Sequence, residues 1–181
     1  TDRIAEVAKG IEADVVVNVQ GDEPLITAEA VEQAVQPLME GPDIVMSTLM
    51  CPIRSSQEFF DPHVVKVITD KQGYAIYFSR WPIPFHRDEW SGCVGAEGIR
   101  VPEQSPTIAN RHIGLYAYRK SFLLRFAGMP ETPLERLEKL EQLRALENGY
   151  KIKVVQTDYR AVGVDVPEDL ERVRALYAQD G

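Results

Sequence analysis

The chain has 181 residues, of which 44% are hydrophobic and 27% are charged, as in an ordinary globular protein of about one domain. Its net charge of -8, from 20 Lys+Arg and 28 Asp+Glu, excludes the basic balance of a duplex nucleic-acid binder. No run of 18 apolar residues and no signal-peptide pattern occur, so we expect a cytoplasmic protein without a membrane span. Cys51 and Cys93 are far apart and in no metal-binding pattern, so we expect two reduced thiols.

Apolar periodicity in the first part of the chain alternates between the helical and the extended type. The run Val15–Val19 is β-branched and nearly continuous, which predicts a strand buried on both faces, in the middle of a parallel sheet. Thr27 is a suitable N-cap for the helix that follows. The predicted elements are a helix over 1–11, a strand over 15–19, a helix over 28–39, a strand over 44–52 and a short helix or turn over 55–60.

The second part begins with a β-hairpin pattern and then a long irregular segment rich in Pro, Gly and charge. The predicted elements are hairpin strands over 64–69 and 74–79, a loop over 80–107, a strand over 111–118, helices over 120–126 and 133–148, a strand over 152–156 and a closing helix over 167–178. This alternation predicts one α/β domain over residues 1–181. We expect a mostly parallel sheet with helices on both faces and an antiparallel hairpin excursion.

Leucines recur every third residue from Leu134 to Leu146, so their stripe spirals around the predicted helix over 133–148. Glu135 and Lys139 have the spacing of an exposed ion pair. Glu141 and Gln142 lie between leucines, at the expected edge of a buried surface. That polar pair could line a pocket or stand at the rim of a subunit contact, and periodicity leaves both interpretations open.

Two aspartates follow predicted strands. Ligands of open α/β sheets bind outside the carboxyl ends of the strands, and short carboxylates there suit Mg²⁺. Asp22 is either such a ligand or the start of a turn that ends the strand. Asp165 is either a ligand or, with Glu168 three residues on, part of a capping box for the closing helix.

Basic and aromatic residues gather around the long loop: Arg80, Arg87, Arg111, His112 and Tyr116. Arginine suits planar recognition of a carboxylate, which favours an anionic small molecule there, although a single surface arginine or a core histidine needs no ligand. The glycine-rich dinucleotide loop, the P-loop, the serine-hydrolase elbow and the zinc-protease motif do not occur in the sequence.

Five collinear blocks resemble the 3-deoxy-manno-octulosonate cytidylyltransferase family, also called CMP-KDO synthetases. They are VVNVQGDEPLI at 16–26, GYAIYFSR at 73–80, RHIGLYAYR at 111–119, LEQLR at 140–144 and GVDVPEDL at 163–170. The resemblance implies a nucleotide-diphospho-sugar transferase fold and Mg²⁺-dependent transfer of CMP from CTP to KDO, with release of pyrophosphate. It also implies a cytosolic homodimer that serves lipopolysaccharide synthesis, and we expect the hairpin region over 64–79 to form part of its interface.

Carried over by position, the resemblance implies that Asp22 and Asp165 are the catalytic, metal-binding aspartates. It places in the sugar site Gln20, Arg87, His112, Tyr116, Glu141 and Gln142, with Arg80 nearby. The family's first strand and nucleotide loop have no counterpart in residues 1–181, so we expect an N-terminally truncated chain that does not turn over alone. A cytidylyltransferase for another acidic sugar, such as a sialate or an 8-amino KDO analogue, and a non-catalytic binding or assembly domain remain alternatives.

Overall fold

The computed structural model describes residues 1–21, 25–90, 94–95, 98–99, 109–160, 171 and 173–174. The helices are α1 (Asp2–Lys9), α2 (Ala28–Glu40), α3 (Ser56–Phe60), α4 (Arg87–Trp90), α5 (Lys120–Ala127), α6 (Pro133–Glu138) and α7 (Gln142–Glu147). The strands are β1 (Val15–Asn18), β2 (Met46–Pro52), β3 (Lys66–Thr69), β4 (Ala75–Ser79), β5 (Val94–Gly95), β6 (Gly98–Ile99), β7 (Asn110–Arg119) and β8 (Lys153–Gln156). The expected closing helix lies outside the described residues, except that residues 171 and 173–174 are helical.

The central sheet is organised around the long strand β7. The strands follow the order β4-β3-β7-β2-β8, and β1 also pairs with β7. The α/β class with a mixed sheet is confirmed, but the expectation of a mostly parallel sheet is wrong for the described strands. Only β2 and β8 pair in parallel, and the pairs of β7 with β1, β2 and β3 are antiparallel. The run Val15–Val19 is not a strand buried on both faces in the middle of the sheet: β1 pairs with β7 alone among the described strands, its residues are half-buried, and Val19 is 43% exposed. A β-branched apolar run indicates a strand, but it gives neither the position of that strand in the sheet nor the direction of its partner.

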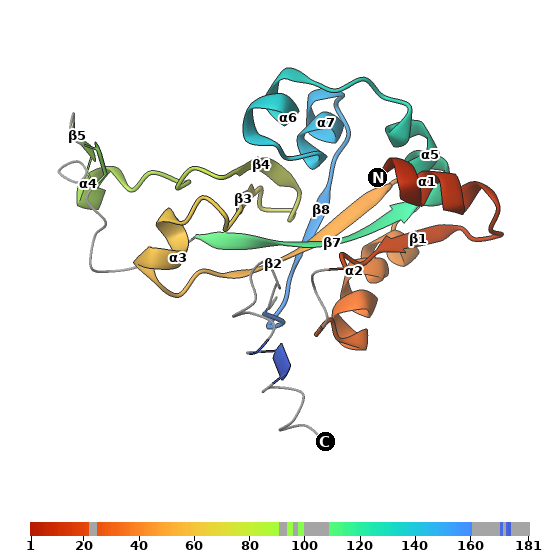
Figure 1. The fold of residues 1–181 in the computed structure, drawn as a ribbon, viewed down its shortest axis with the longest axis horizontal. Helices are drawn as coiled ribbons and strands as arrows, with labels where there is room; N and C mark the ends of the chain where they lie inside the picture. Colours follow the sequence, from red (N-terminus) through yellow and green to blue (C-terminus); the bar gives the residue numbers. More distant parts are fainter. Residues whose placement is uncertain are drawn as a thin grey trace.

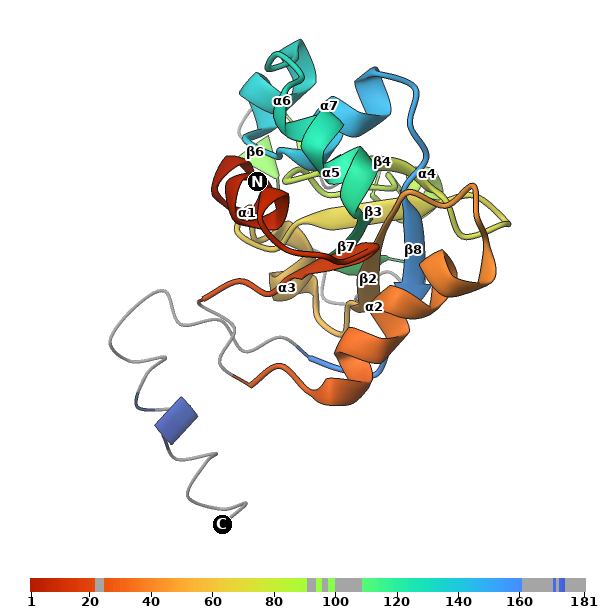
Figure 2. The same cartoon turned by 90° about the vertical axis from the view of Figure 1, so that its right-hand side faces the viewer.

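Helices cover both faces of this sheet, as expected. Figure 2 shows α2 against one face and α1, α5, α6 and α7 against the other. Alternate residues of β7 point to the two layers: Ile113, Leu115 and Ala117 pack with α2, whereas Tyr116 and Tyr118 pack in the larger core with α5 and α7. Figure 1 shows β7 running across the middle of the molecule, so both cores are built on the two faces of one strand.

The predicted helix over 133–148 is broken into α6 and α7. Lys139, at the break, has φ 53, which lies in the left-handed region. Among the described non-glycine residues, only Lys139 has a positive φ. The change of direction buries Leu140 and Leu143 while Leu137 is 80% exposed. A leucine stripe at intervals of three cannot stay on one face of a straight helix, and the break resolves this conflict. The expected Glu135–Lys139 pair is also wrong, since Glu135 pairs with Arg144.

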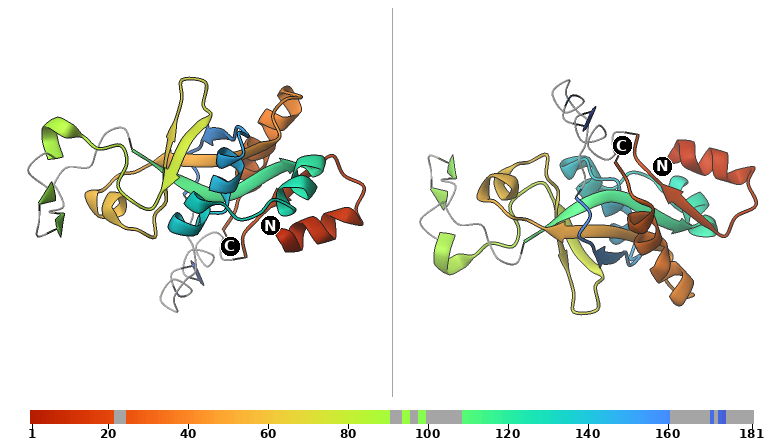
Figure 3. Two further views of the ribbon diagram at one scale, coloured as in Figure 1. Left: turned by 90° about the horizontal axis from the view of Figure 1, so that it is seen from above. Right: turned by 90° about the horizontal axis from the view of Figure 1, so that it is seen from below.

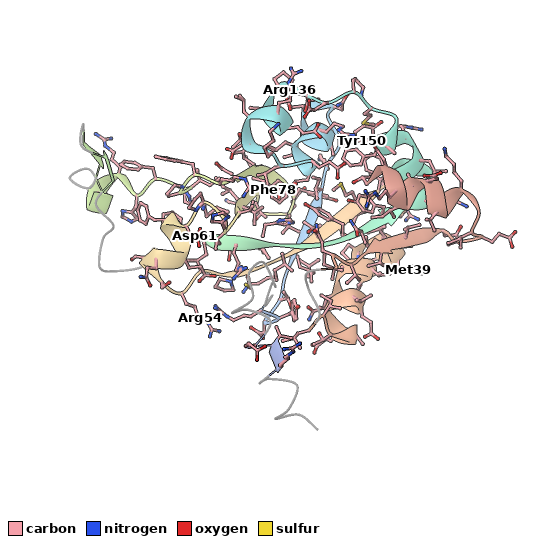
Figure 4. All side chains as sticks on the ribbon, in the orientation of Figure 1. Met39, Arg54, Asp61, Phe78, Arg136 and Tyr150 are labelled. Atoms are coloured by element: carbon pink, nitrogen blue, oxygen red, sulfur yellow. The ribbon has the colours of Figure 1, made fainter. Side chains whose placement is uncertain are left out.

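The β3–β4 hairpin has the expected turn. Oδ1 of Asp70 accepts hydrogen bonds from the backbone N–H groups of Gln72 (2.8 Å) and Tyr74 (2.9 Å), and Gly73 adopts φ 76. Phe78, labelled in Figure 4, points into the core and is fully buried. Tyr74 is covered by Lys151 and Lys153, whose Nζ atoms lie 5.2 and 5.0 Å from its ring centroid. The aromatic residues of the hairpin are therefore not an open apolar surface.

The expected long loop contains α4 and a small two-stranded β5–β6 ladder among its described residues. Both views of Figure 3 place α4 at one end of the molecule, beyond α3 and away from the central sheet. Within the described part of the chain, no helix is long and apolar enough to cross a bilayer.

Candidate functional site

The edge of β7 that faces β1 and β3 is divided between these two strands. β1 pairs with Tyr116–Arg119, whereas β3 pairs with Asn110 and Arg111. The stretch Ile113–Leu115 therefore lies on this edge between the end of β1, at Asn18, and the start of β3, at Lys66. Several residues of the expected sugar site lie around this division of the edge.

The other edge of β7 carries an irregularity at the same level. In the pairing with β2, Thr48 lies opposite Tyr116 but Leu49 lies opposite Ile113, so Gly114 and Leu115 bulge out of the ladder. The hydroxyl of Thr48 lies 3.0 Å from the carbonyl oxygen of Ile113 and 2.9 Å from that of Leu115. A bulge bends a strand and turns its side chains, and bulges are frequent beside functional sites.

His112 is the polar side chain at the start of this bulge. Its Nε2 lies 2.8 Å from Oγ1 of Thr48, and its ring contacts those of Phe78 (centroids 5.0 Å apart) and Tyr116 (5.3 Å). Burial, with a smaller contribution from the nearby Arg111 cation, lowers the pKa of His112 to about 3. The imidazole is therefore neutral at pH 7, so it can donate from one nitrogen and accept at the other.

Tyr116 and Tyr118 continue the aromatic row along the same face. Their ring centroids are 5.8 Å apart, and both residues are buried. Burial raises the pKa of the Tyr116 phenol well above its ordinary value, and Tyr118 and the carboxylate of Glu141 add to this. Tyr116 is therefore a neutral phenol, available as a hydrogen-bond donor.

Gln20 reaches the bulge from the segment after β1. A Cβ atom added to Gly114 would lie 3.3 Å from Nε2 of Gln20 and 3.6 Å from its Cδ. The missing side chain at position 114 thus makes room for the exposed side chain of Gln20. The structure brings Gln20, His112 and Tyr116 together at the division of the sheet.

Glu141 and Gln142 occupy the junction between α6 and α7, above the same face. Gln142 is buried and Glu141 is half-buried, as expected for the edge of a buried surface. Glu141 accepts a hydrogen bond from the hydroxyl of Thr1, and its Oε1 lies 3.6 Å from Nη2 of Arg144. Leu140 and Leu143, which flank Glu141 and Gln142, pack in the same core cluster as Tyr116, so the junction belongs to the same neighbourhood.

Arg80 lies beside this junction, but its guanidinium is held by backbone groups. Its Nε donates to the carbonyl oxygen of Glu138 (2.8 Å), and its Nη1 donates to that of Pro62 (3.0 Å). The Glu138 carboxylate in turn accepts from the Ser79 hydroxyl (2.6 Å) and from the Arg80 backbone N–H (2.9 Å). Arg80 therefore ties the end of β4 to the end of α6. Arg87 lies on α4, exposed and apart from the other sugar-site residues.

The two expected metal ligands, Asp22 and Asp165, lie outside the described residues, as does Cys93. Within the described ranges, no group of three or more His, Cys, Asp or Glu side chains could hold a metal ion. Gly21, the last described residue before Asp22, follows directly on Gln20, so the chain enters the Asp22 segment from the division of the sheet. The carboxylate pair itself has the hard oxygen donors that Mg²⁺ prefers.

Sequence reasoning missed Thr48, Gly114 and Glu138. The signal for Thr48 was present, since Ser47 and Thr48 interrupt an otherwise apolar strand and both are fully buried. Buried hydroxyls have to be hydrogen-bonded, which points to a polar arrangement inside the core. Glycine at position 114 and glutamate at position 138 give no comparable signal, because their roles depend on contacts with distant segments.

Comparison with known proteins gives a consistent result. The family model for cytidylyltransferases matches residues 1–152. The 3-deoxy-manno-octulosonate cytidylyltransferase of Syntrophotalea carbinolica is 58% identical over 175 residues, which cover 97% of this chain and 68% of that protein. That of Trichlorobacter lovleyi is 48% identical over 179 residues, which cover 99% of this chain and 69% of the relative.

A solved structure of CMP:2-keto-3-deoxy-manno-octonic acid synthetase complexed with CTP is similar to this fold. It shares 38% sequence identity and superimposes with a TM-score of 0.83, over 99% of this chain and 68% of that one. The likeness thus extends through the division of the sheet, the bulge of β7 and the α6–α7 junction.

Proposed function

Because this chain belongs to the cytidylyltransferase family, and within it to the 3-deoxy-manno-octulosonate cytidylyltransferases, we propose that it transfers CMP from CTP to KDO. The anomeric hydroxyl oxygen of KDO forms a bond to the α-phosphorus of CTP, the bond between the α- and β-phosphoryl groups breaks, and pyrophosphate leaves. The product is the activated sugar used in lipopolysaccharide synthesis. The observation that carries this proposal is the 58% identity with a relative of that name over nearly the whole chain.

The described residues suit an acidic, hydroxyl-rich sugar. Gln20, neutral His112 and the Tyr116 phenol offer both donors and acceptors, and Glu141 and Gln142 add further ones from the α6–α7 junction. Polar groups that are fixed before the ligand arrives lose little entropy on binding. Arg87 is the sequence-based candidate for the sugar carboxylate, and its place on α4 requires that α4 and the sugar approach each other in the complex.

We further propose that the reaction depends on Mg²⁺ held by Asp22 and Asp165. The ion would supply electrostatic stabilisation of the charge that develops on the phosphoryl oxygens. The support is the donor chemistry of two carboxylates and the position of Asp22 directly after the segment that reaches the bulge.

The test is product analysis with the full-length protein, CTP and Mg²⁺. KDO, a sialic acid, an 8-amino KDO analogue and neutral mannose are offered in separate reactions, and pyrophosphate and the CMP-sugar are measured by coupled assay and mass spectrometry. We expect CMP-KDO as the product formed with the highest kcat/KM. A higher kcat/KM for another acidic sugar would reassign the substrate, and the absence of any CMP-sugar would contradict transferase function.

We also propose that the protein is a homodimer that uses the β3–β4 hairpin. β4 ends the strand order, and its Ile76 is 60% exposed. Edge strands with exposed apolar side chains favour association with another chain. Light scattering should give twice the monomer mass, and Ile76→Lys should reduce it to the monomer mass. A monomer at every concentration tested would remove this proposal.

A further inference from the structure

Thr48 occupies the one point where the β2–β7 ladder loses its register. Opposite the break, the bulge turns two carbonyl groups of β7, those of Ile113 and Leu115, toward the Thr48 hydroxyl at 3.0 and 2.9 Å. Thr48 is fully buried. It is out of reach of a ligand, so any effect it has on the site passes through its neighbours.

The hydrogen atoms at this point can be assigned by counting donors and acceptors. A threonine hydroxyl donates one hydrogen, and carbonyl oxygens only accept. The Thr48 hydroxyl also lies 2.8 Å from Nε2 of His112. If the hydroxyl donated to Nε2, both carbonyl oxygens would lose their donor. If it donates to a carbonyl oxygen, Nε2 of His112 carries the hydrogen and donates to Oγ1, so one carbonyl group and the imidazole are both satisfied and only the second carbonyl contact lacks a hydrogen of its own.

This arrangement leaves Nδ1 as the acceptor of the His112 ring. The ring is neutral, because burial lowers its pKa to about 3. Its orientation is fixed by Phe78 and Tyr116, whose ring centroids lie 5.0 and 5.3 Å away. A neutral imidazole with a defined tautomer is a directional partner for a hydroxyl group, whereas a mixture of tautomers offers the correct nitrogen only part of the time.

We propose that Thr48 is a positioning residue for the sugar site: its hydroxyl holds the β7 bulge and fixes His112 as the Nε2–H tautomer, so that Nδ1 accepts a hydrogen bond from a sugar hydroxyl. The inference rests on the proposed function in naming the sugar as the ligand. The tautomer itself does not depend on that function. Thr48 touches no substrate, and its contribution is the geometry of His112.

The experiment compares Thr48→Val, which removes the hydroxyl at nearly constant shape, with Thr48→Ser, which keeps it. Ser47→Ala is the matched control. Ser47 is the preceding residue of β2 and is equally buried, but its hydroxyl donates to the Ala34 carbonyl oxygen on the opposite face, against α2. Ser47→Ala therefore removes a buried hydroxyl from the same strand without touching His112.

The first measurement is the histidine tautomer in long-range ¹H–¹⁵N spectra of the full-length protein. Residues 1–181 contain three histidines, and replacing His63 or His86 by Gln identifies their signals. We expect His112 as Nε2–H in the wild type, in Thr48→Ser and in Ser47→Ala, and a mixture of tautomers in Thr48→Val. A wild-type His112 that carries its hydrogen on Nδ1 overturns the proposal, whether or not any variant folds.

The second measurement is steady-state kinetics with KDO. We expect Thr48→Val to lower kcat/KM for the sugar by about 10–100-fold, because a small misplacement of a positioning group has effects of this size. Thr48→Ser should recover most of the loss, and the KM for CTP should not change in any variant. An equal loss in Ser47→Ala, or an unchanged kcat/KM in Thr48→Val, overturns the positioning role. A wild-type protein that forms no CMP-KDO removes the proposed function, and the tautomer measurement still decides the role of Thr48.

Discussion

Arg144 and Glu135 form a buried ion pair in which Nε lies 2.8 Å from Oε2 and Nη2 lies 2.5 Å from Oε1. The same guanidinium lies 5.2 Å from the ring centroid of Phe126 and donates to the Met129 carbonyl oxygen at 3.3 Å. One side chain of α7 thus joins α5, the loop after it and α6. Because α7 begins at Gln142, this pair also holds one wall of the candidate sugar site.

Replacing Glu135 by Gln should lower the free energy of unfolding by about 3 kcal/mol, because it leaves the buried Arg144 cation without its countercharge. Urea denaturation at pH 7 measures this change. The control is Glu171→Gln, since Glu171 and Arg174 form an exposed pair that contributes less than about 1 kcal/mol. Equal effects of the two substitutions would contradict the importance of the buried pair.

The stabilisation by this pair should disappear in acid. Burial alone would raise the pKa of Glu135, but hydrogen bonds from Arg144 and from the Thr132 N–H outweigh it and lower the pKa below its ordinary value of 4.5. A lowered folded-state pKa gives stability that is complete above about pH 4.5 and is lost as pH falls through the folded-state pKa. The difference in unfolding free energy between wild type and Glu135→Gln should therefore shrink below pH 4.5. A constant difference would contradict this assignment.

Lys66 should make stability rise with pH in the alkaline range. Its Nζ donates to the carbonyl oxygens of Asp61 (2.9 Å), Val64 (2.6 Å) and Arg80 (2.6 Å), and burial lowers its pKa from 10.5 to about 8. Between these values the unfolded chain binds more protons than the folded one, so raising the pH favours folding. The unfolding free energy of the wild type, relative to Lys66→Met, should increase from pH 7.5 to 10. A difference that stays flat or falls over this pH range would contradict a lowered pKa of Lys66 in the folded protein.

Gly114→Ala should weaken sugar binding without unfolding the protein. The added Cβ would lie 3.3 Å from Nε2 of Gln20, which is the movable end of a side chain, so Gln20 shifts rather than the backbone. We expect the KM for KDO to rise about 10-fold, because a misplaced polar group loses its hydrogen bond to the sugar. Gly10→Ala is the control, since its Cβ would meet only the Val7 carbonyl oxygen, at 3.8 Å. Equal KM values for KDO in Gly114→Ala and Gly10→Ala would contradict the placement of Gln20 in the sugar site.

Asp22→Asn and Asp165→Asn should each lower kcat by orders of magnitude in the full-length protein, and chelation of Mg²⁺ should do the same to the wild type. Asp43→Asn, at an exposed position, should not change kcat. If Asp165 is instead a helix cap, its replacement would cost only about 0.5–2 kcal/mol of stability and spare the chemistry. Urea denaturation and pyrophosphate release measured on the same variants separate these roles.

The sequence predicted the strands of the central sheet and the helices α1, α2, α3 and α5 because their signals are local, but it did not predict α4, the β5–β6 ladder or the break between α6 and α7. Thr27 caps α2 through a hydrogen bond from the Ala30 N–H at 3.2 Å, as expected from residue type alone. The hairpin turn at Asp70 and Gly73 is equally local. Strand direction is not, because the apolar run Val15–Val17 indicates a strand and says nothing about the direction of its partner β7.

The candidate site shows the same limit. The resemblance named His112, Tyr116 and Gln20, and the structure places them around one bulge. It did not name Thr48. The two hydroxyl residues in an apolar strand indicated a polar arrangement in the core, but the register shift beside Thr48 depends on how two strands pair, and the pattern of neither strand predicts it. The break at Lys139 is intermediate: the leucine spacing indicated a conflict with a straight helix, but the position of the left-handed residue follows from tertiary packing.

The place of β7 in the sheet also bears on how the chain folds during its synthesis. β1 and β2 are made early, but both pair with β7, which reaches completion only at Arg119. The β3–β4 hairpin closes locally, whereas the other two strands have to wait for a distant partner, and contacts between distant segments form slowly. Until then the nascent chain carries two apolar strands with unpaired edges, which invite association with other chains. A translation product that stops before residue 110 would therefore aggregate rather than fold, although it contains more than half of the sheet's strands.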